Sequence, residues 1–146
     1  MIHIAICDDE KHMSDHIRAM ASDFFRKKNR EIQLRTFLSG EELLNYDGQI
    51  DILFLDIQMN GMDGLETARK LRAGKFRGFL IFITVLKEMV FQSFEVQAYD
   101  YLVKPVDEKQ FEKTMERLFA SMQNVGEDSL LVQQGYERRI VPKDEI

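Results

Sequence analysis

Short apolar runs alternate with amphipathic segments along most of this chain. The apolar runs are rich in Ile, Leu, Val and Phe, and bounded runs of about four to eight such residues predict strands. They cover residues 2–7, 31–38, 52–56, 79–84 and 100–103. Elsewhere apolar residues recur at helical spacing, which predicts amphipathic helices. These helices are expected over about 10–27, 39–44, 65–71, 88–96 and 107–122.

Three of these helices carry recognisable end signals. Ser39 is followed three residues later by Glu42, which is the capping-box pattern at a helix start. Asp107 is expected to be the N-cap of the last helix. Gly74 is expected to end the helix that begins near Leu65.

Strands that alternate with helices predict an α/β fold. Such a chain forms a parallel sheet with helices on both faces, and right-handed crossovers leave few topologies. We therefore predict a five-stranded parallel sheet in the flavodoxin-like order 2-1-3-4-5. In this order the carboxyl ends of the first and third strands are neighbours. The length of 146 residues supports one such domain with a short remainder.

The third strand is the most informative stretch of the sequence. Residues 52–55 are all large and apolar, and Asp56 follows them directly. A continuous apolar run predicts a strand buried on both faces, and ligands bind at the carboxyl ends of such strands. We therefore predict that Asp56 is a nucleophile that accepts a phosphoryl group.

Acidic residues at the end of the first strand should meet Asp56. Asp8 and Asp9 follow that strand, and three carboxylates in one crevice would take up a proton or a cation. Oxygen ligands of this kind suit Mg²⁺. We predict that Asp9 and Asp56 bind the metal directly and that Asp8 binds it mainly through water. The backbone carbonyl of Gln58 is expected to complete the site.

The ends of the fourth and fifth strands supply two further groups. Thr84 can donate a hydroxyl hydrogen bond to a phosphoryl oxygen, and Lys104 can approach the same oxygens as a point charge. The Lys104–Pro105 bond is a candidate cis peptide that would direct the lysine inward.

Together these residues resemble the receiver domain of two-component response regulators. The resemblance covers about residues 1–122 and rests on strand-end residues, namely Asp8, Asp9, Asp56, Thr84, Lys104 and Pro105. It implies that Asp56 accepts phosphate from a phosphohistidine on a sensor histidine kinase, with Mg²⁺ as cofactor. It also implies that Thr84 and Lys104 hold the phosphoryl group, and that Tyr101 is a switch aromatic that turns inward with Thr84.

The sequences of residues 56–59 and 94–105 are most similar to LytTR-type (LytR/AlgR-like) regulators. Residues 129–142 read as two short strands around Gly135 and are similar to the opening of a LytTR DNA-binding domain. The resemblance implies a receiver domain at 1–122, a linker at 123–128 and the truncated start of a C-terminal DNA-binding domain at 129–146. It further implies control of transcription, with homodimerisation on phosphorylation.

Two residues depart from the usual receiver pattern. Asn60 stands where a proline usually follows the methionine, and Val85 stands where a small residue usually follows the threonine. We expect a more mobile loop at Asn60. We expect the branched Val85 side chain to narrow access to the phosphoryl group and to change the rates of its transfer or hydrolysis.

Composition adds limits on location and partners. The formal charge of −5 argues against DNA binding through the overall charge of this chain. One cysteine excludes an internal disulfide, and no apolar run approaches the ~20 residues that span a bilayer. The chain also enters its first strand at Ile2, so we expect no signal peptide. We therefore expect a cytoplasmic protein without a membrane partner.

Three alternatives share features with this interpretation. A stand-alone receiver in a phosphorelay would use the same site without a DNA-binding domain. A Mg²⁺-dependent phosphohydrolase with an aspartyl-phosphate intermediate commonly has an acid/base carboxylate two residues after its nucleophile, but Gln58 occupies that position. An FMN carrier needs a Gly/Ser/Thr-rich phosphate loop, whereas this chain has Asp8, Asp9 and Glu10 there.

Overall fold

The computed structural model describes residues 1–85 and 96–127, and for 124–127 it describes the backbone alone. The expected helix at 88–96 and the expected strands of the tail therefore lie outside the described residues, apart from Val96. The chain divides into two compact units, Met1–Phe111 and Glu112–Ile146. The whole sheet and every candidate site residue belong to the first unit.

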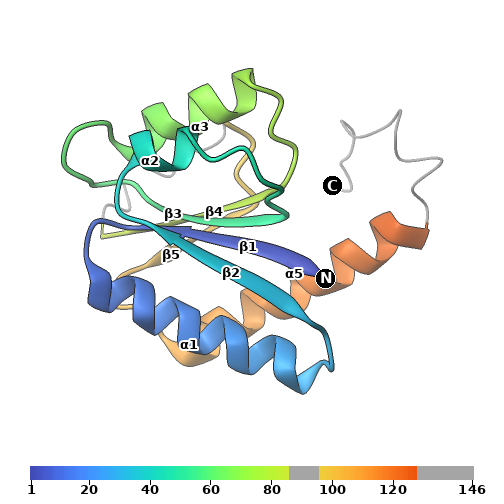
Figure 1. The fold of residues 1–146 in the computed structure, drawn as a ribbon. Coiled ribbons are helices and arrows are strands. Elements are labelled where there is room, and N and C mark those ends of the chain that lie inside the picture. Colours follow the sequence, from blue (N-terminus) through green and yellow to red (C-terminus); the bar gives the residue numbers. More distant parts are fainter. Residues whose placement is uncertain (86–95, 128–146) are drawn as a thin grey trace. The chain divides into compact units, whose positions relative to one another are not determined.

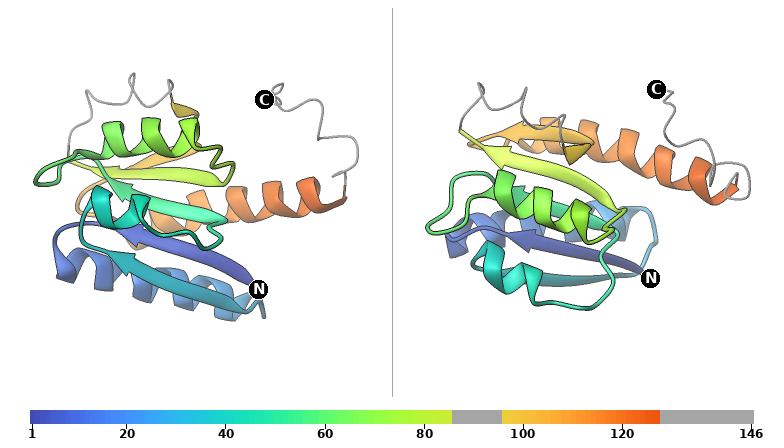
Figure 2. Two further views of the ribbon diagram at one scale, coloured as in Figure 1. Left: turned by 45° about the horizontal axis from the view of Figure 1, so that its top comes forward. Right: turned by 90° about the horizontal axis from the view of Figure 1, so that it is seen from above.

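The first unit contains one five-stranded parallel sheet (Figure 1). Its strands are β1 (Ile2–Cys7), β2 (Ile32–Phe37), β3 (Ile52–Asp56), β4 (Phe79–Thr84) and β5 (Asp100–Val103). They lie side by side in the order β2-β1-β3-β4-β5 (Figure 2). The predicted fold class and strand order are confirmed.

The described helices are α1 (Lys11–Lys27), α2 (Gly40–Leu44), α3 (Gly64–Ala73) and α5 (Glu108–Glu127). α1 covers one face of the sheet, and α2 and α3 lie on the opposite face (Figure 1). None of the helices within the described ranges is long and apolar enough to cross a membrane. α5 begins in the first unit and continues in the second.

The expected helix signals are present as hydrogen bonds. The Ser39 hydroxyl accepts from the Glu42 N–H at 3.0 Å, and the Glu42 carboxylate accepts from the Leu38 N–H at 2.8 Å. The Asp107 carboxylate accepts from the Gln110 N–H at 3.1 Å. The bonds to the Glu42 and Gln110 N–H groups satisfy donors that a helix start leaves without an intrahelical partner, whereas the Leu38 N–H lies just before Ser39, the N-cap of α2.

α5 extends five residues beyond the helix end expected from the sequence. It reaches Glu127, so residues 123–127 of the expected linker are helical. The polar composition of this segment does not by itself stop a helix, and the glycine in it costs only about 1 kcal/mol relative to alanine.

β3 forms the centre of the core. All five of its residues are buried. Leu53 and Leu55 belong to a hydrophobic cluster that also contains Leu65 and Ala68 of α3. Phe54 instead stacks on Phe111, with ring centroids 5.7 Å apart. Burial on both faces explains the unbroken apolar run in the sequence.

The register brings the functional candidates to one edge of the sheet. Cys7 pairs with Leu55, so Asp8, which follows Cys7, and Asp56, which follows Leu55, lie at the same end of the sheet. Ile83 pairs with Asp56, and Thr84 pairs with Val103. The carboxyl ends of β1, β3, β4 and β5 therefore converge on one crevice.

Candidate functional site

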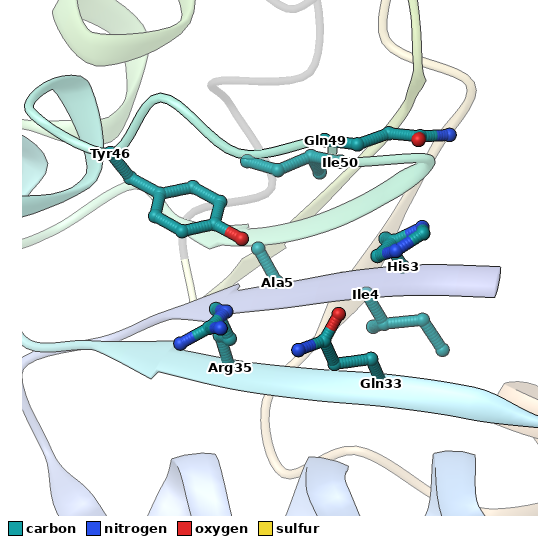
Figure 3. A pocket seen from close by; sticks show the side chains of 8 residues that line it. All are labelled: His3, Ile4, Ala5, Gln33, Arg35, Tyr46, Gln49 and Ile50. Atoms are coloured by element: carbon teal, nitrogen blue, oxygen red, sulfur yellow. The ribbon is translucent and has the colours of Figure 1, made fainter. Parts of the chain in front are cut away.

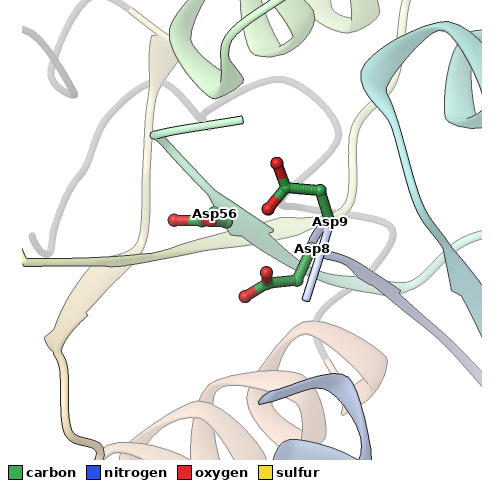
Figure 4. Close-up of side chains that lie close together, drawn as sticks. All are labelled: Asp8, Asp9 and Asp56. Carbon is green, nitrogen blue, oxygen red and sulfur yellow. The ribbon is translucent and has the colours of Figure 1, made fainter. Parts of the chain in front are cut away.

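Three carboxylates meet at the carboxyl ends of β1 and β3. Asp8, Asp9 and Asp56 each offer an oxygen atom, and these atoms lie within 4.8 Å of one another (Figure 4). Asp8 and Asp56 are buried, with 2% and 3% of their surface exposed, whereas Asp9 is half-buried. The expected convergence of these three side chains is therefore present.

Lys104 supplies positive charge to this cluster. Its Nζ atom lies 3.3 Å from Asp8 Oδ2 and 3.3 Å from Asp56 Oδ2. A third carboxylate, Glu10 Oε1, lies 3.9 Å away. The Lys104–Pro105 peptide bond, a candidate cis bond from the sequence, is cis. Sequence reasoning placed Lys104 near the phosphoryl oxygens but missed the contact with Glu10.

Burial and like charge raise the pKa of Asp56 to about 7. Desolvation is the largest cause, and the Asp8 carboxylate adds to it, while Lys104 and the backbone N–H of Gln58 oppose it. Burial by itself would lower the pKa of Lys104, but Asp56 and Asp8 outweigh this and raise it. The lysine is therefore held as an ammonium beside a carboxyl group that titrates near neutral pH.

Backbone hydrogen bonds hold the ends of β3, β4 and β5 in register. The Ile57 N–H donates to the Ile83 carbonyl at 3.3 Å, and the Lys104 N–H donates to the Thr84 carbonyl at 2.9 Å. Thr84 is buried, with 1% of its surface exposed. It is the last residue of β4, as the sequence predicted, and it follows Ile83, which pairs with Asp56.

The loop between β3 and α3 folds closely against the site. The Gly64 N–H donates to the Ile57 carbonyl at 2.8 Å. A Cβ atom on Gly64 would lie 2.2 Å from the Asp56 carbonyl oxygen, so this close approach requires glycine. In the same loop, the Asn60 N–H donates to Asp9 Oδ2 at 3.0 Å. Sequence reasoning missed this contact because any residue except proline offers a backbone N–H.

The other three candidates lie around this centre. Gln58 is exposed at the start of the loop. Tyr101 is partly buried and packs against the hydrophobic cluster that contains Leu55. Val85 directly follows Thr84 and is 55% exposed.

The donor set matches a hard divalent cation. The clustered donors are carboxylate oxygens, which suit Mg²⁺. The nearby sulfur is not a competing ligand, because burial, with a smaller contribution from Asp8, raises the pKa of the Cys7 thiol to about 12. Cys7 Sγ instead donates to the Ser39 carbonyl at 3.3 Å. The residues present therefore fit Mg²⁺ better than a thiophilic metal.

A separate shallow depression, too small to enclose a water molecule, lies beside β1 and β2 (Figure 3). Several of its polar lining groups already have partners within the protein. His3 Nδ1 lies 3.3 Å from Asp51 Oδ2, and the Arg35 guanidinium lies 5.3 Å from the centre of the Tyr46 ring. None of the site residues expected from the sequence lines this depression, so we assign the chemistry to the acidic crevice.

Comparison with known proteins supports the family resemblance stated from the sequence. Residues 4–116 match the family model described as the response regulator receiver domain. The sensory transduction protein LytT of Oceanobacillus iheyensis is 34% identical over 122 residues, which are 80% of this chain and 48% of LytT. The transcriptional regulatory protein BtsR of Escherichia coli K12 is 34% identical over 125 residues, which are 81% of this chain and 48% of BtsR.

A solved structure adds a comparison of the fold. The response regulator TrrA of Thermotoga maritima, in complex with Mg²⁺ and BeF, is 27% identical with a TM-score of 0.63. The match covers 81% of this chain and 99% of the TrrA chain. The chain described here spans about half the length of the curated relatives named above.

Proposed function

The chain belongs to the response regulator receiver domain family, and from that premise we propose that Asp56 accepts a phosphoryl group from a sensor histidine kinase. Receiver domains are signalling domains rather than classical enzymes. The observation that carries the proposal is the convergence of Asp8, Asp9 and Lys104 on Asp56. The LytTR-type relatives support the assignment to a two-component system.

Mg²⁺ is the cofactor that the donor set favours. Asp9 and Asp56 would bind it directly, Asp8 would bind it mainly through water, and the Gln58 carbonyl would complete the set. When bound, it supplies positive charge that offsets the carboxylates and the phosphoryl oxygens. The TrrA structure, a complex with Mg²⁺ and BeF, supports this assignment by similarity.

The transfer itself forms one bond and breaks one bond. An oxygen of the Asp56 carboxylate attacks phosphorus, and the phosphorus–nitrogen bond of the donor phosphohistidine breaks. The imidazole leaves with the electron pair of that bond and takes up a proton. Asp56 must be ionised for this attack, and Lys104 favours the ionised form. Lys104 and the Thr84 hydroxyl then contact the transferred phosphoryl oxygens.

The added charge would be read out by a change in packing near β5. Thr84 moves toward the phosphoryl group, and Tyr101 turns inward from its partly buried position. This is a local electrostatic change coupled to a two-state surface. That surface is expected to include the helix at 88–96, which lies outside the described residues apart from Val96.

The output assignment rests on the relatives rather than on the described residues. We propose a receiver domain at 1–122, a linker at 123–128, of which residues 123–127 continue α5, and the start of a LytTR-type DNA-binding domain at 129–146. The relatives are about twice as long as the matched segment and include a transcriptional regulatory protein. Phosphorylation would favour a homodimer that places two such domains on DNA, in a cytoplasmic regulator.

Acetyl phosphate labelling tests the central proposal. The wild-type protein should gain the mass of one phosphoryl group in the presence of Mg²⁺, and EDTA should prevent this gain. Asp56→Asn should gain no mass, whereas Asp47→Asn, which changes an exposed carboxylate, should label like the wild type. Labelling of Asp56→Asn to the wild-type level would exclude Asp56 as the acceptor.

Beryllofluoride with Mg²⁺ tests the output. It should increase the dimer fraction of the wild-type chain in light scattering and leave Asp56→Asn unchanged. If the wild type labels with acetyl phosphate but stays monomeric with beryllofluoride, a relay role replaces the dimerisation mechanism.

A further inference from the structure

We infer that the backbone N–H of Asn60 is a positioning group for Asp9 and that it sets the affinity of the acidic site for Mg²⁺. The inference rests on the proposed function, because it takes Asp9 to be a metal ligand. It concerns a main-chain group in the loop between β3 and α3, and Asn60 acts through Asp9 rather than by touching the metal.

The hydrogen bond joins two distant parts of the chain. The Asn60 N–H lies 3.0 Å from Asp9 Oδ2 across a sequence separation of 51 residues. A carboxylate oxygen that accepts one hydrogen bond retains a lone pair for a cation. Such partners of a metal ligand fix its orientation, and their loss typically weakens metal affinity about 10- to 100-fold.

Asp9 depends on this contact more than the other two carboxylates depend on theirs. Lys104 lies 3.3 Å from both Asp8 and Asp56, and Asp8 also accepts from the Glu10 N–H at 2.9 Å. Within the described part of the chain, Asp9 has the Asn60 N–H as its hydrogen-bond partner. This N–H is therefore the group that orients Asp9.

The loop around Asn60 is anchored at both ends. Gly64 bonds back to Ile57 at 2.8 Å, and the φ angle of +77° at Gly61 lies in the left-handed region that favours glycine. The Asn60 side chain is exposed, so it can be substituted without loss of core packing. Substitutions at position 60 can therefore test the side-chain amide and the backbone N–H separately.

Two variants at this position make the test. Asn60→Pro removes the N–H, and Asn60→Ala retains it while removing the side-chain amide. Mg²⁺ affinity is measured by calorimetric titration of the chain at fixed pH and ionic strength. Because the contact is exposed to solvent, we expect the affinity of Asn60→Pro to fall about five- to tenfold, at the lower end of the usual range. Asn60→Ala should bind within about twofold of the wild type.

A double-mutant cycle shows whether the effect passes through Asp9. In an Asp9→Ala background, which removes the acceptor, Asn60→Pro should cause no further loss of Mg²⁺ affinity. A persisting loss would assign the effect to the restricted backbone at Met59 and overturn the inference. Equal affinities of the wild type and Asn60→Pro would also overturn it while leaving the proposed function intact.

Amide hydrogen exchange gives a readout that needs neither metal nor proline. The Asn60 amide should be protected in the wild type without Mg²⁺ and should exchange faster in Asp9→Ala. Equal exchange in the two proteins would overturn the inference even if Asn60→Pro fails to fold. If the wild type binds no Mg²⁺, both the inference and the proposed metal site are wrong, which distinguishes this outcome from the others.

Discussion

Lys104 Nζ lies 3.3 Å from Asp56 Oδ2, although β4 separates the strands that carry these two residues. The lysine therefore reaches across the end of β4 to neutralise a carboxylate on the central strand. It lies at the same distance from Asp8, so one ammonium group serves two buried acids. The Lys104 ammonium group therefore offsets negative charge on both Asp8 and Asp56.

Lys104→Met should destabilise the fold at pH 8. The substitution keeps most of the side-chain volume but leaves Asp8 and Asp56 without their ammonium partner. Removing one member of a buried charged group typically costs about 3–5 kcal/mol, and the 14% exposure of the Lys104 side chain argues for about 2–4 kcal/mol. Urea denaturation in EDTA measures this change. Lys109→Met, at an exposed position, is the matched control, and equal losses in both variants would contradict the prediction.

Asp56→Asn should stabilise the protein at pH 8 and have little effect at pH 4. The pKa of about 7 in the folded state exceeds the ordinary value of 3.8, so the folded protein favours the protonated acid. This contribution to stability is fully present below pH 3.8 and is lost as pH rises through about 7. The neutral amide avoids that loss. The free energy of unfolding of Asp56→Asn should therefore exceed that of the wild type by on the order of 2–4 kcal/mol at pH 8.

Thermal unfolding in EDTA at several pH values checks this dependence. Asp47→Asn removes an exposed carboxylate and controls for net charge. A gain for Asp56→Asn that is the same at pH 4 and pH 8 would rule out the elevated pKa. Mg²⁺ should raise the unfolding temperature of the wild type more than that of Asp56→Asn, since a ligand that binds the folded state stabilises it.

The Cys7 thiol should resist alkylation in the folded protein. Its pKa is raised to about 12, chiefly by burial and then by the charge of Asp8, and the thiolate is the reactive form. Iodoacetamide at pH 8 should therefore label the native chain far more slowly than the chain in urea, as followed by intact mass. Rapid labelling of the native chain would show that the strand end opens.

Arg72 of α3 donates to four backbone carbonyls at distances between 2.8 and 3.0 Å, namely those of Val96, Gln97, Phe76 and Gly78. Burial, with a smaller contribution from Arg77, lowers the pKa of its guanidinium to about 10. The planar guanidinium thus joins the end of α3 to the segment that enters β5.

Arg72→Lys should lower the free energy of unfolding by about 1–3 kcal/mol, because an ammonium group cannot reproduce this planar arrangement of donors. Arg77→Lys is the control, since Arg77 is exposed and the charge is retained. Chemical denaturation of the two variants gives the difference. A loss for Arg72→Lys no larger than that for Arg77→Lys would show that the carbonyl contacts contribute little to stability.

Val85→Ala should shorten the lifetime of the phosphorylated form. Val85 directly follows Thr84, whose hydroxyl is proposed to contact the phosphoryl group, and it is 55% exposed. Replacing it with a smaller side chain should admit water more readily to the phosphoryl group. Loss of label after removal of acetyl phosphate measures the lifetime. Equal lifetimes in Val85→Ala and the wild type would rule out a gating role.

The sequence by itself determined the order of the elements and the positions of the reactive groups. Apolar periodicity is a local property, so it located the strands, and right-handed crossovers left few ways to arrange them. Asp56 and Lys104 could be identified because Asp56 ends one strand and Lys104 directly follows another, and the carboxyl ends of these parallel strands must lie at the same end of the sheet.

Only the tertiary structure decided which groups touch. The bond from the Asn60 N–H to Asp9 and the carbonyl contacts of Arg72 involve the main chain, which is the same at nearly every residue and leaves no mark in the sequence. The reach of Lys104 to Asp8 likewise depends on the placement of strands that are distant along the chain. Such contacts follow from the path of the backbone, because side-chain patterns specify which face is buried but not the atom that each polar group meets.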